Sequence, residues 1–298
     1  MSGPAAPGGA DAQIRDVRYQ RDDGERRGRV AGVVSLARWG ALRALGARRG
    51  WKAKIVPIAL VLAALGPAVV LLGVRALFAE RTGLDLTDAL PFSDYQAIIG
   101  VTILLFAGIV TPELLCPDRR DGTLSLYFST AVSRSEYLAG RALGAVLPLL
   151  LVTLVPMLVL YGGILVFEEH PLGYLQGNWA ELPRIFGAGF ILAIYYAAVG
   201  LAVSSLAGRR AYAVGGYLLL LIAPTLVSGL VRESVSGGAE ALDLMALSTL
   251  PIGFAAKLFP DAADEVPNAI GLWALAYLVV VLAAVAVLLR RYRAGVDE

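Results

Sequence analysis

The sequence predicts an all-α integral membrane protein with six transmembrane helices and both termini in the cytoplasm. Of its 298 residues 57% are hydrophobic, which is more apolar material than a soluble domain of this size can bury. Six apolar runs are long enough to cross roughly 30 Å of hydrocarbon, for which a helix needs about 20 residues. No segment alternates in polarity as the strands of a transmembrane barrel do. The fold class is therefore helical.

The six predicted spans share an apolar composition and lie at residues 55–74, 95–115, 142–167, 185–207, 211–231 and 270–289. Glu113, directly after Pro112, is the only charged residue in them. We expect it to reach the interface or to pair with an arginine such as Arg119, and proton coupling is the alternative role. Prolines at three further sites predict kinks that packing or a substrate path could use: Pro148, Pro156 and Pro224.

Loop charge assigns both termini to the cytoplasm, because Lys and Arg accumulate on that side of multi-pass proteins. Residues 1–54 hold 12 Lys and Arg, residues 116–141 hold 4, residues 208–210 hold 2 and the tail after Leu289 holds 3. The remaining 5 of the 26 fall in loops on the other side. Positive charge is nearly all arginine, which suggests a GC-rich bacterial genome, so we expect a multi-pass protein of the bacterial cytoplasmic membrane.

Two different segments precede the first span. Residues 1–30 have too few large apolar side chains to offset the entropy of ordering, so we expect a disordered cytoplasmic tail. The first apolar run follows this long polar arm, so we expect no cleavable signal peptide. Residues 31–54 mix tryptophan with arginine and predict an interfacial helix, since both side chains prefer the depth of the headgroups.

The periodicity of that interfacial helix is poor. Arg43 falls near the helical angle of Leu36, and Gly40 and Gly46 weaken a helix. An ordinary positively charged flank of the first span is the alternative interpretation.

A polar block separates the second and third spans. Four consecutive charged residues would each cost roughly 2.5 to 3.5 kcal/mol in hydrocarbon and must project from the bilayer: Asp118, Arg119, Arg120 and Asp121. Gly122 permits a turn, and the run that follows it places Leu124, Tyr127 and Phe128 on one helical face. Such a short amphipathic helix would dock on a partner surface, although any polar loop can contain a short helix.

The start of the third span carries a capping box. In Ser133-Arg134-Ser135-Glu136, the serine and glutamate satisfy each other's free amides at the beginning of a helix. The short amphipathic helix is therefore expected to be joined rigidly to the third span.

The order PELLCPDRRDGTLSLYFSTAVSRSEYLAGRALG, residues 112–144, resembles the loop between the second and third spans of ABC-2 type transporter permeases. The matching residues are Asp118, Arg119, Arg120, Gly122, Thr123, Leu124, Leu126, Tyr127, Ser133, Arg134, Tyr137, Gly140 and Arg141. That family commonly has proline before the Ser-Arg pair, where this chain has Ala131-Val132. The six-span plan extends the resemblance over most of the chain.

The resemblance implies the membrane-spanning subunit of a bacterial ABC exporter, with a short coupling helix that docks on a separate ATPase subunit. The implied coupling residues are Asp118, Arg119, Arg120, Asp121, Gly122, Thr123, Leu124, Tyr127, Phe128, Ser133, Arg134 and Glu136. It also implies an interfacial helix before the first span and short helices before the last. ATP and Mg would bind the ATPase subunit, and a second copy of the chain or a homologous permease would complete the pathway within the membrane lipids.

Residues 232–269 fit that plan. The run ALDLMALSTLPIGFAAKLF is apolar but is broken by Pro251 and Gly253 and contains Asp243 and Lys257. A seventh span would also move the C-terminal arginines to the wrong side. Two short interfacial or re-entrant segments are therefore expected, followed by the last span and a cytoplasmic tail at 292–298.

The sequence lacks the residues that several kinds of chemistry require. No GxxxxGK[ST] motif occurs, so we expect no ATPase or other enzymatic activity and no cofactor in this chain. The single cysteine, Cys116, excludes an internal disulfide and a cysteine metal cluster. His170 beside Glu168 and Glu169 is expected to be solvated, with metal binding as the minor alternative. A net charge of +2 does not suggest nucleic-acid binding.

Two other function classes stay open. One is a stand-alone ion- or proton-coupled secondary transporter, which would show internal repeats and polar residues near the middle of the membrane. No convincing repeat is visible, and the middle of each span is nearly all apolar. The other is a membrane enzyme or scaffold, for which catalytic residues are not found. The sequence does not predict the substrate.

Overall fold

A computed structural model gives the fold and describes residues 28–47, 50–82, 92–124, 127, 133–168, 170–234, 240–263 and 266–294. All regular secondary structure in these ranges is helical. Six helical segments are long and apolar enough to cross a membrane, which confirms the fold class and the number of spans. The tail expected to be disordered lies outside the described residues, apart from its last three positions.

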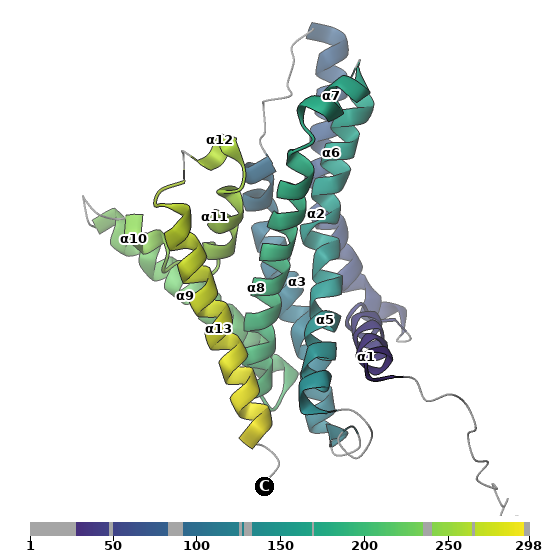
Figure 1. The fold of residues 1–298 in the computed structure, drawn as a ribbon, viewed down its shortest axis with the longest axis vertical. Helices are drawn as coiled ribbons and strands as arrows, with labels where there is room; N and C mark the ends of the chain where they lie inside the picture. The colour runs from purple at the N-terminus through teal and green to yellow at the C-terminus, as the bar shows by residue number, and fades with distance from the viewer. Residues whose placement is uncertain are drawn as a thin grey trace, which may run out of the picture.

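The helices follow one another along the chain as α1 (Arg29–Ala44), α2 (Trp51–Thr82), α3 (Phe92–Arg120), α5 (Arg134–Thr153), α6 (Val155–Phe167), α7 (Pro171–Gly177), α8 (Glu181–Leu206), α9 (Arg210–Ser234), α10 (Glu240–Asp243), α11 (Leu250–Ala256), α12 (Pro260–Ala263) and α13 (Ile270–Ala294). Helices α5 and α6 together form the third span. Figure 1 shows α3, the α5–α6 span and α8 running along the long axis of the molecule, with α9 and α13 inclined to it.

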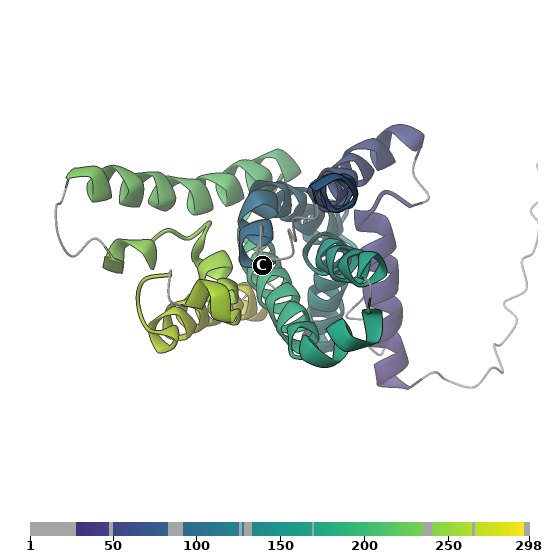
Figure 2. The same ribbon diagram turned by 90° about the horizontal axis from the view of Figure 1, so that it is seen from above.

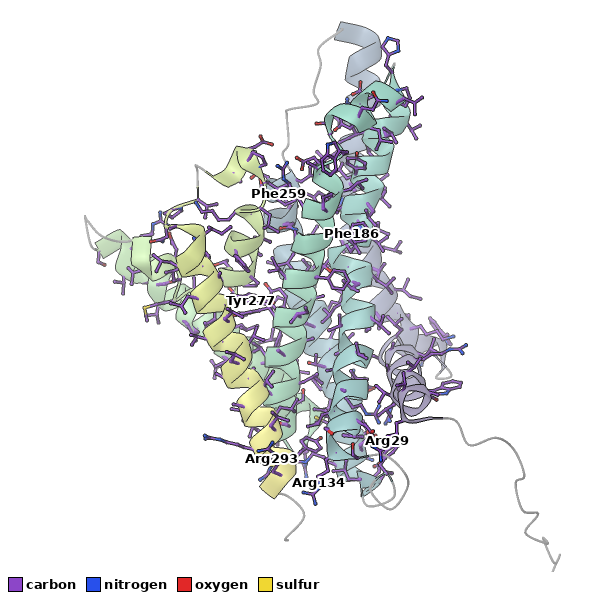
Figure 3. All side chains as sticks on the ribbon, in the orientation of Figure 1. Arg29, Arg134, Phe186, Phe259, Tyr277 and Arg293 are labelled. Carbon is purple, nitrogen blue, oxygen red and sulfur yellow. The ribbon has the colours of Figure 1, made fainter. Side chains whose placement is uncertain are left out.

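The two ends of the bundle differ in composition. At the lower end in Figure 1, α3 and α13 finish and α5 and α9 begin, and we call this the arginine-rich end. Figure 3 shows Arg29, Arg134 and Arg293 gathered there. The opposite end carries α7 and α12, and we call it the α7 end. The loops that the sequence assigns to one side of the membrane thus meet at one end of the fold.

Three spans form the centre of the bundle. In α3, the α5–α6 span and α8, 72%, 56% and 67% of the most apolar window is buried, whereas the corresponding values for α2, α9 and α13 are 17%, 17% and 22%. Glycine allows the closest of these approaches, because a Cβ on Gly200 of α8 would lie 2.4 Å from the Thr111 hydroxyl of α3. Seen from above, α9 and α13 lie to one side of this centre (Figure 2). The peripheral spans therefore leave apolar faces exposed.

The third span is interrupted at Leu154, between α5 and α6. Pro156 lies in the first turn of α6, where the backbone N–H that proline lacks needs no partner within the helix. Inside a longer helix, the same missing N–H would leave one hydrogen bond unmade. The interruption lies two residues before Pro156, where the sequence predicts a kink. Pro148 and Pro224 lie inside continuous helices, α5 and α9. At the break, the Thr153 hydroxyl donates to the Gly189 carbonyl of α8 at 3.0 Å.

The segment before the last span contains three short helices, α10, α11 and α12, where two short pieces were predicted. Helix α11 packs against α3, α8 and α13. Its preceding turn is held by two tyrosines of α8: Tyr195 donates to the Leu247 carbonyl at 2.8 Å and Tyr196 to the Ser248 carbonyl at 2.7 Å. Backbone without helical partners is thus satisfied inside the protein, as membrane depth requires.

Helix α1 lies across the bundle axis, since it is seen end-on in Figure 1 and lengthwise in Figure 2. It ends at Ala44 and does not extend to residue 54, as the sequence had suggested. The chain turns through Leu45 and Gly46, whose φ of +77° favours glycine, and α2 already begins at Trp51. The predicted interfacial segment is therefore a helix, a turn and the start of the first span.

Helix α7 was not predicted. It begins with Pro171 directly after the exposed His170, at the end opposite to the arginine-rich end. Nearby, Arg75 of α2 forms an ion pair with Glu168. The loop charges had assigned both residues to the same side of the membrane.

Candidate functional site

Asp118 lies in the last turns of α3 with only 3% of its surface exposed. The sequence predicts that it projects from the bilayer with its three charged neighbours, but its burial against other helices was not predicted. A buried carboxylate is tolerated only when it is paired and hydrogen-bonded. The surrounding helices supply those partners.

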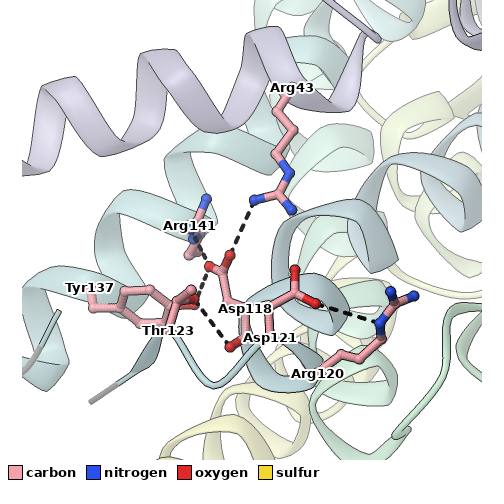
Figure 4. Close-up of polar contacts among 7 residues, drawn as sticks. All are labelled: Arg43, Asp118, Arg120, Asp121, Thr123, Tyr137 and Arg141. Atoms are coloured by element: carbon pink, nitrogen blue, oxygen red, sulfur yellow. Dashed lines mark hydrogen bonds and ion pairs between the residues drawn. The ribbon is translucent and has the colours of Figure 1, made fainter. Parts of the chain in front are cut away.

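Three side chains donate to the Asp118 carboxylate (Figure 4). Arg43 Nη1 of α1 lies 3.1 Å from Oδ1, the Tyr137 hydroxyl of α5 lies 2.8 Å from Oδ2, and Arg141 Nη2 of α5 also contacts Oδ2. Tyr137 and Arg141 are four residues apart and therefore share one face of α5. We call Arg43, Asp118, Tyr137 and Arg141 the Asp118 cluster. It ties α1, α3 and α5 together at the arginine-rich end.

Aromatic rings surround the buried guanidinium of Arg141. Its Cζ lies 5.2 Å from the ring centroid of Tyr137 and 5.8 Å from that of Tyr127, within the range of cation–π attraction. The Tyr127 and Tyr137 rings are 5.5 Å apart, and Tyr292 of α13 lies 5.8 Å from Tyr137. Tyr127 thus contacts the protein's own cluster, whereas the sequence had placed it on a face turned to a partner.

Glycines bring α1 close enough for Arg43 to reach Asp118. A Cβ on Gly140 of α5 would lie 2.7 Å from Leu36, and one on Gly144 would lie 3.1 Å from the Ala37 carbonyl. Small residues permit this kind of close helix contact in membranes. The irregular position of Arg43 near the angle of Leu36 is explained by this packing, because both side chains belong to the face of α1 that meets the bundle.

The start of α5 is fixed as the sequence predicts. Ser133 accepts from the Glu136 amide at 3.3 Å, and Glu136 accepts from the Ser133 amide at 2.7 Å, which confirms the capping box. Glu136 also lies 3.9 Å from Arg29, and Arg134 donates to the Arg293 carbonyl at 3.3 Å. These contacts connect the first turn of α5 to α1 and α13.

The other charged residues of the block take different positions. Arg119 donates to the Ser205 carbonyl at the end of α8. Arg120 and Asp121 form an exposed ion pair at 3.5 Å, so these two project from the bundle as expected. Four charges that look equivalent in the sequence therefore separate into a buried acid, a cap on α8 and an exposed pair.

The turn after α3 fits its sequence. Gly122 has a φ of +65°, which a side chain would disfavour, and the Thr123 hydroxyl donates to the Asp118 carbonyl at 3.2 Å. Leu124 is partly buried against the core, and the Tyr127 amide donates to the Thr123 carbonyl at 3.2 Å, as in one helical turn. Phe128 lies outside the described residues, so the predicted amphipathic helix is described only at its beginning.

Glu113 forms a second ion pair, in which the carboxylate is buried and the arginine is half-exposed. It is 3% exposed, and its Oε1 lies 2.9 Å from Arg210 Nη1 at the start of α9. An arginine partner was expected, but Arg119 was the wrong choice because it turns toward α8. The pair joins α3 to α9, so arginines connect α3 to α1, α5, α8 and α9 at this end.

The remaining candidate residues are the possible metal ligands and the single cysteine. Among the described residues, no group of three His, Cys, Asp or Glu side chains could hold a metal ion, and Cys116 is buried.

No protein-family model matches the sequence, and no curated protein is significantly similar to it. The Asp118 cluster can link helices mechanically and electrostatically, and it stands next to the segment that joins α3 to α5.

Proposed function

We propose that the chain is the transmembrane permease subunit of an ATP-binding cassette exporter, driven by ATP that a separate nucleotide-binding subunit hydrolyses. The arginine-rich end would face the cytoplasm of a bacterium. The segment between α3 and α5 would contact the ATPase subunit, which would bind ATP and Mg. The Asp118 cluster is the observation that carries the proposal.

The cluster has the geometry that coupling requires. A loop transmits force to transmembrane helices only if both of its ends are held firmly. Here Asp118, three residues before Asp121, is bonded to two side chains in the first turns of α5 and to one of α1. A push on the loop would therefore move α1, α3 and α5 together.

The loop also offers a surface to a partner. Arg120, Asp121, Ser133 and Arg134 are exposed on either side of it. In the proposed cycle, ATP draws two ATPase subunits together, the loops of two permease subunits follow, and the spans change between inward- and outward-open arrangements. The second permease would be another copy of this chain or a homologue.

The location of the buried charges supports this proposal over a stand-alone carrier. Within the described spans the buried charged side chains are Glu113, Asp118 and Arg141, all near the arginine-rich end. A proton- or ion-coupled carrier places such groups near the middle of the membrane. The central part of the bundle instead contains tyrosines and hydroxyls.

Co-purification with a candidate ATPase, encoded beside this chain's gene, tests the proposal. We expect the pair to co-purify from detergent and the permease to change the rate of ATP turnover. Arg120→Glu should abolish the complex, since it reverses an exposed charge beside the loop. Tyr137→Phe should keep the complex but weaken the response of ATP turnover, because it removes the 2.8 Å hydrogen bond to Asp118.

Arg290→Glu is the matched control, because it reverses an exposed charge of α13 at the same end, outside the segment between α3 and α5. It should leave both complex formation and ATP turnover unchanged. Full transport by the purified chain without any ATPase subunit would refute the proposal.

A further inference from the structure

A polar pocket of about 700 Å³ opens at the arginine-rich end, between α1, α3 and the loop that joins α8 to α9. Four arginines and two carboxylates are among its lining residues, which are Arg43, Glu113, Cys116, Pro117, Arg120, Asp121, Gly208, Arg209 and Arg210. A cavity of this size is large enough for an organic ligand. Its lining carries excess positive charge.

The carboxylates of the pocket are already neutralised. Glu113 lies 2.9 Å from Arg210, and Asp121 lies 3.5 Å from Arg120. Arg43 is engaged by Asp118 behind the wall of the pocket. Within the described part of the chain, no carboxylate forms an ion pair with Arg209, which is exposed. Arg209 is thus available to an anion.

A second pocket of about 280 Å³ adjoins the first and shares Arg43, Glu113 and Arg210 with it. Its lining adds Lys52, which likewise forms no ion pair among the described residues, and a group of apolar side chains at the start of α2 and in α3: Val56, Pro57 and Ile109. Val56 is 50% exposed on the surface of α2 that faces the surroundings of the bundle. The two pockets together have a cationic end and an apolar wall, part of which is exposed on the surface of the bundle at Val56.

This combination matches one class of ligand. The anionic headgroup of a phospholipid would meet Arg209 in the first pocket and Lys52 in the second, and an acyl chain would cover the wall beside Val56. Free phosphate would use only the cationic end, and a zwitterionic headgroup would bring its own cation to a site that already holds arginines. Basic pockets between transmembrane helices are known to hold anionic lipid headgroups.

We propose that these joined pockets bind an anionic phospholipid, with its phosphate at Lys52 and Arg209 and an acyl chain along the apolar wall. The lipid would bridge α1, α2, α3 and α9 next to the Asp118 cluster. The site would help to hold α1 in place, since Arg43 belongs both to the pocket and to the cluster. This inference does not depend on an ATPase partner.

Native mass spectrometry of the purified full chain, titrated with phosphatidylglycerol, tests the site. One saturable phosphatidylglycerol should bind, well ahead of phosphatidylcholine. The double variant Lys52→Gln/Arg209→Gln should weaken that binding about thirtyfold, from the usual contribution of two cations near a lipid surface. Both substitutions spare the buried ion pairs, so the fold should be retained.

The matched control is Arg290→Gln/Arg291→Gln, which removes two exposed arginines of α13 at the same end but outside the pocket. Equal losses in the two double variants, or equal binding of the two lipids, would overturn the proposal. Inorganic phosphate distinguishes the source of the phosphoryl group. Complete displacement of the lipid by millimolar phosphate would refute a lipid site, whereas the weakening of lipid binding by Val56→Asn would support one.

Discussion

Removing the buried carboxylate gives the sharpest test of the Asp118 cluster. Asp118→Ala leaves the Arg141 guanidinium without its counterion, and the side chains of this pair are only 3% and 4% exposed. Breaking a buried ion pair from one side costs about 3–5 kcal/mol. Arg43 adds little to that cost, because its side chain is 33% exposed and can be solvated by water.

Asp121→Ala is the matched control, since it removes the same group three residues later. Asp121 is 53% exposed, and its pair with Arg120 should contribute less than about 1 kcal/mol. At about 2–4 °C per kcal/mol, Asp118→Ala should lower the unfolding midpoint by about 6–20 °C, and Asp121→Ala by about 4 °C at most.

The chain contains its own reporter of unfolding. Cys116 is its single cysteine and is only 3% exposed, at the wall of the polar pocket, so a thiol-reactive fluorophore reacts with it much faster once the bundle opens. The fluorescence of each purified variant during heating gives the midpoint. Equal midpoints for Asp118→Ala and Asp121→Ala would refute the conclusion that Asp118 is a structural centre of this end.

Two further predictions concern the same end of the bundle and its orientation. Arg210→Gln should lower the unfolding midpoint because it leaves Glu113 buried without a counterion, and adding Glu113→Gln should restore part of the loss; an additive double variant would show that the pair is not coupled. In a chain with Cys116→Ser, an impermeant maleimide should label His170→Cys in intact cells but Ser133→Cys only after permeabilisation. The reverse pattern of labelling would contradict a cytoplasmic arginine-rich end.

Sequence reasoning found the spans because a bilayer imposes length and apolarity on each of them separately. The break at Pro156 and the cap at Ser133 were equally visible, since both depend on residues close in sequence. The burial of Asp118 was not predicted, because it depends on donors from two other helices. One signal did exist: Arg43 disturbs the apolar face of α1, and a charge on a buried face requires a partner of opposite sign.

Other contacts left no trace in the sequence. Tyr195 and Tyr196 bind backbone carbonyls, which every residue possesses, so no pattern identifies the turn that they hold. The choice of Arg210 over Arg119 as the partner of Glu113 depends on how α8 and α9 are placed beside α3. Tertiary packing decides between partners that local spacing treats as equal.

The interruption at Leu154 divides the third span into two helices of unequal length. Helix α5 has 20 residues and helix α6 has 13, which corresponds to about 30 Å and about 20 Å of helix. The span contacts α8 closely at this point, where the Thr153 hydroxyl donates to the Gly189 carbonyl and a Cβ on Gly189 would lie 3.1 Å from Leu154. The cluster residues Tyr137 and Arg141 lie 17 and 13 residues before Leu154, about 25 Å and about 20 Å of helix. A span that tilts as one body about this contact would therefore carry a sideways displacement of the Asp118 cluster to α7 with its direction reversed and its size nearly unchanged.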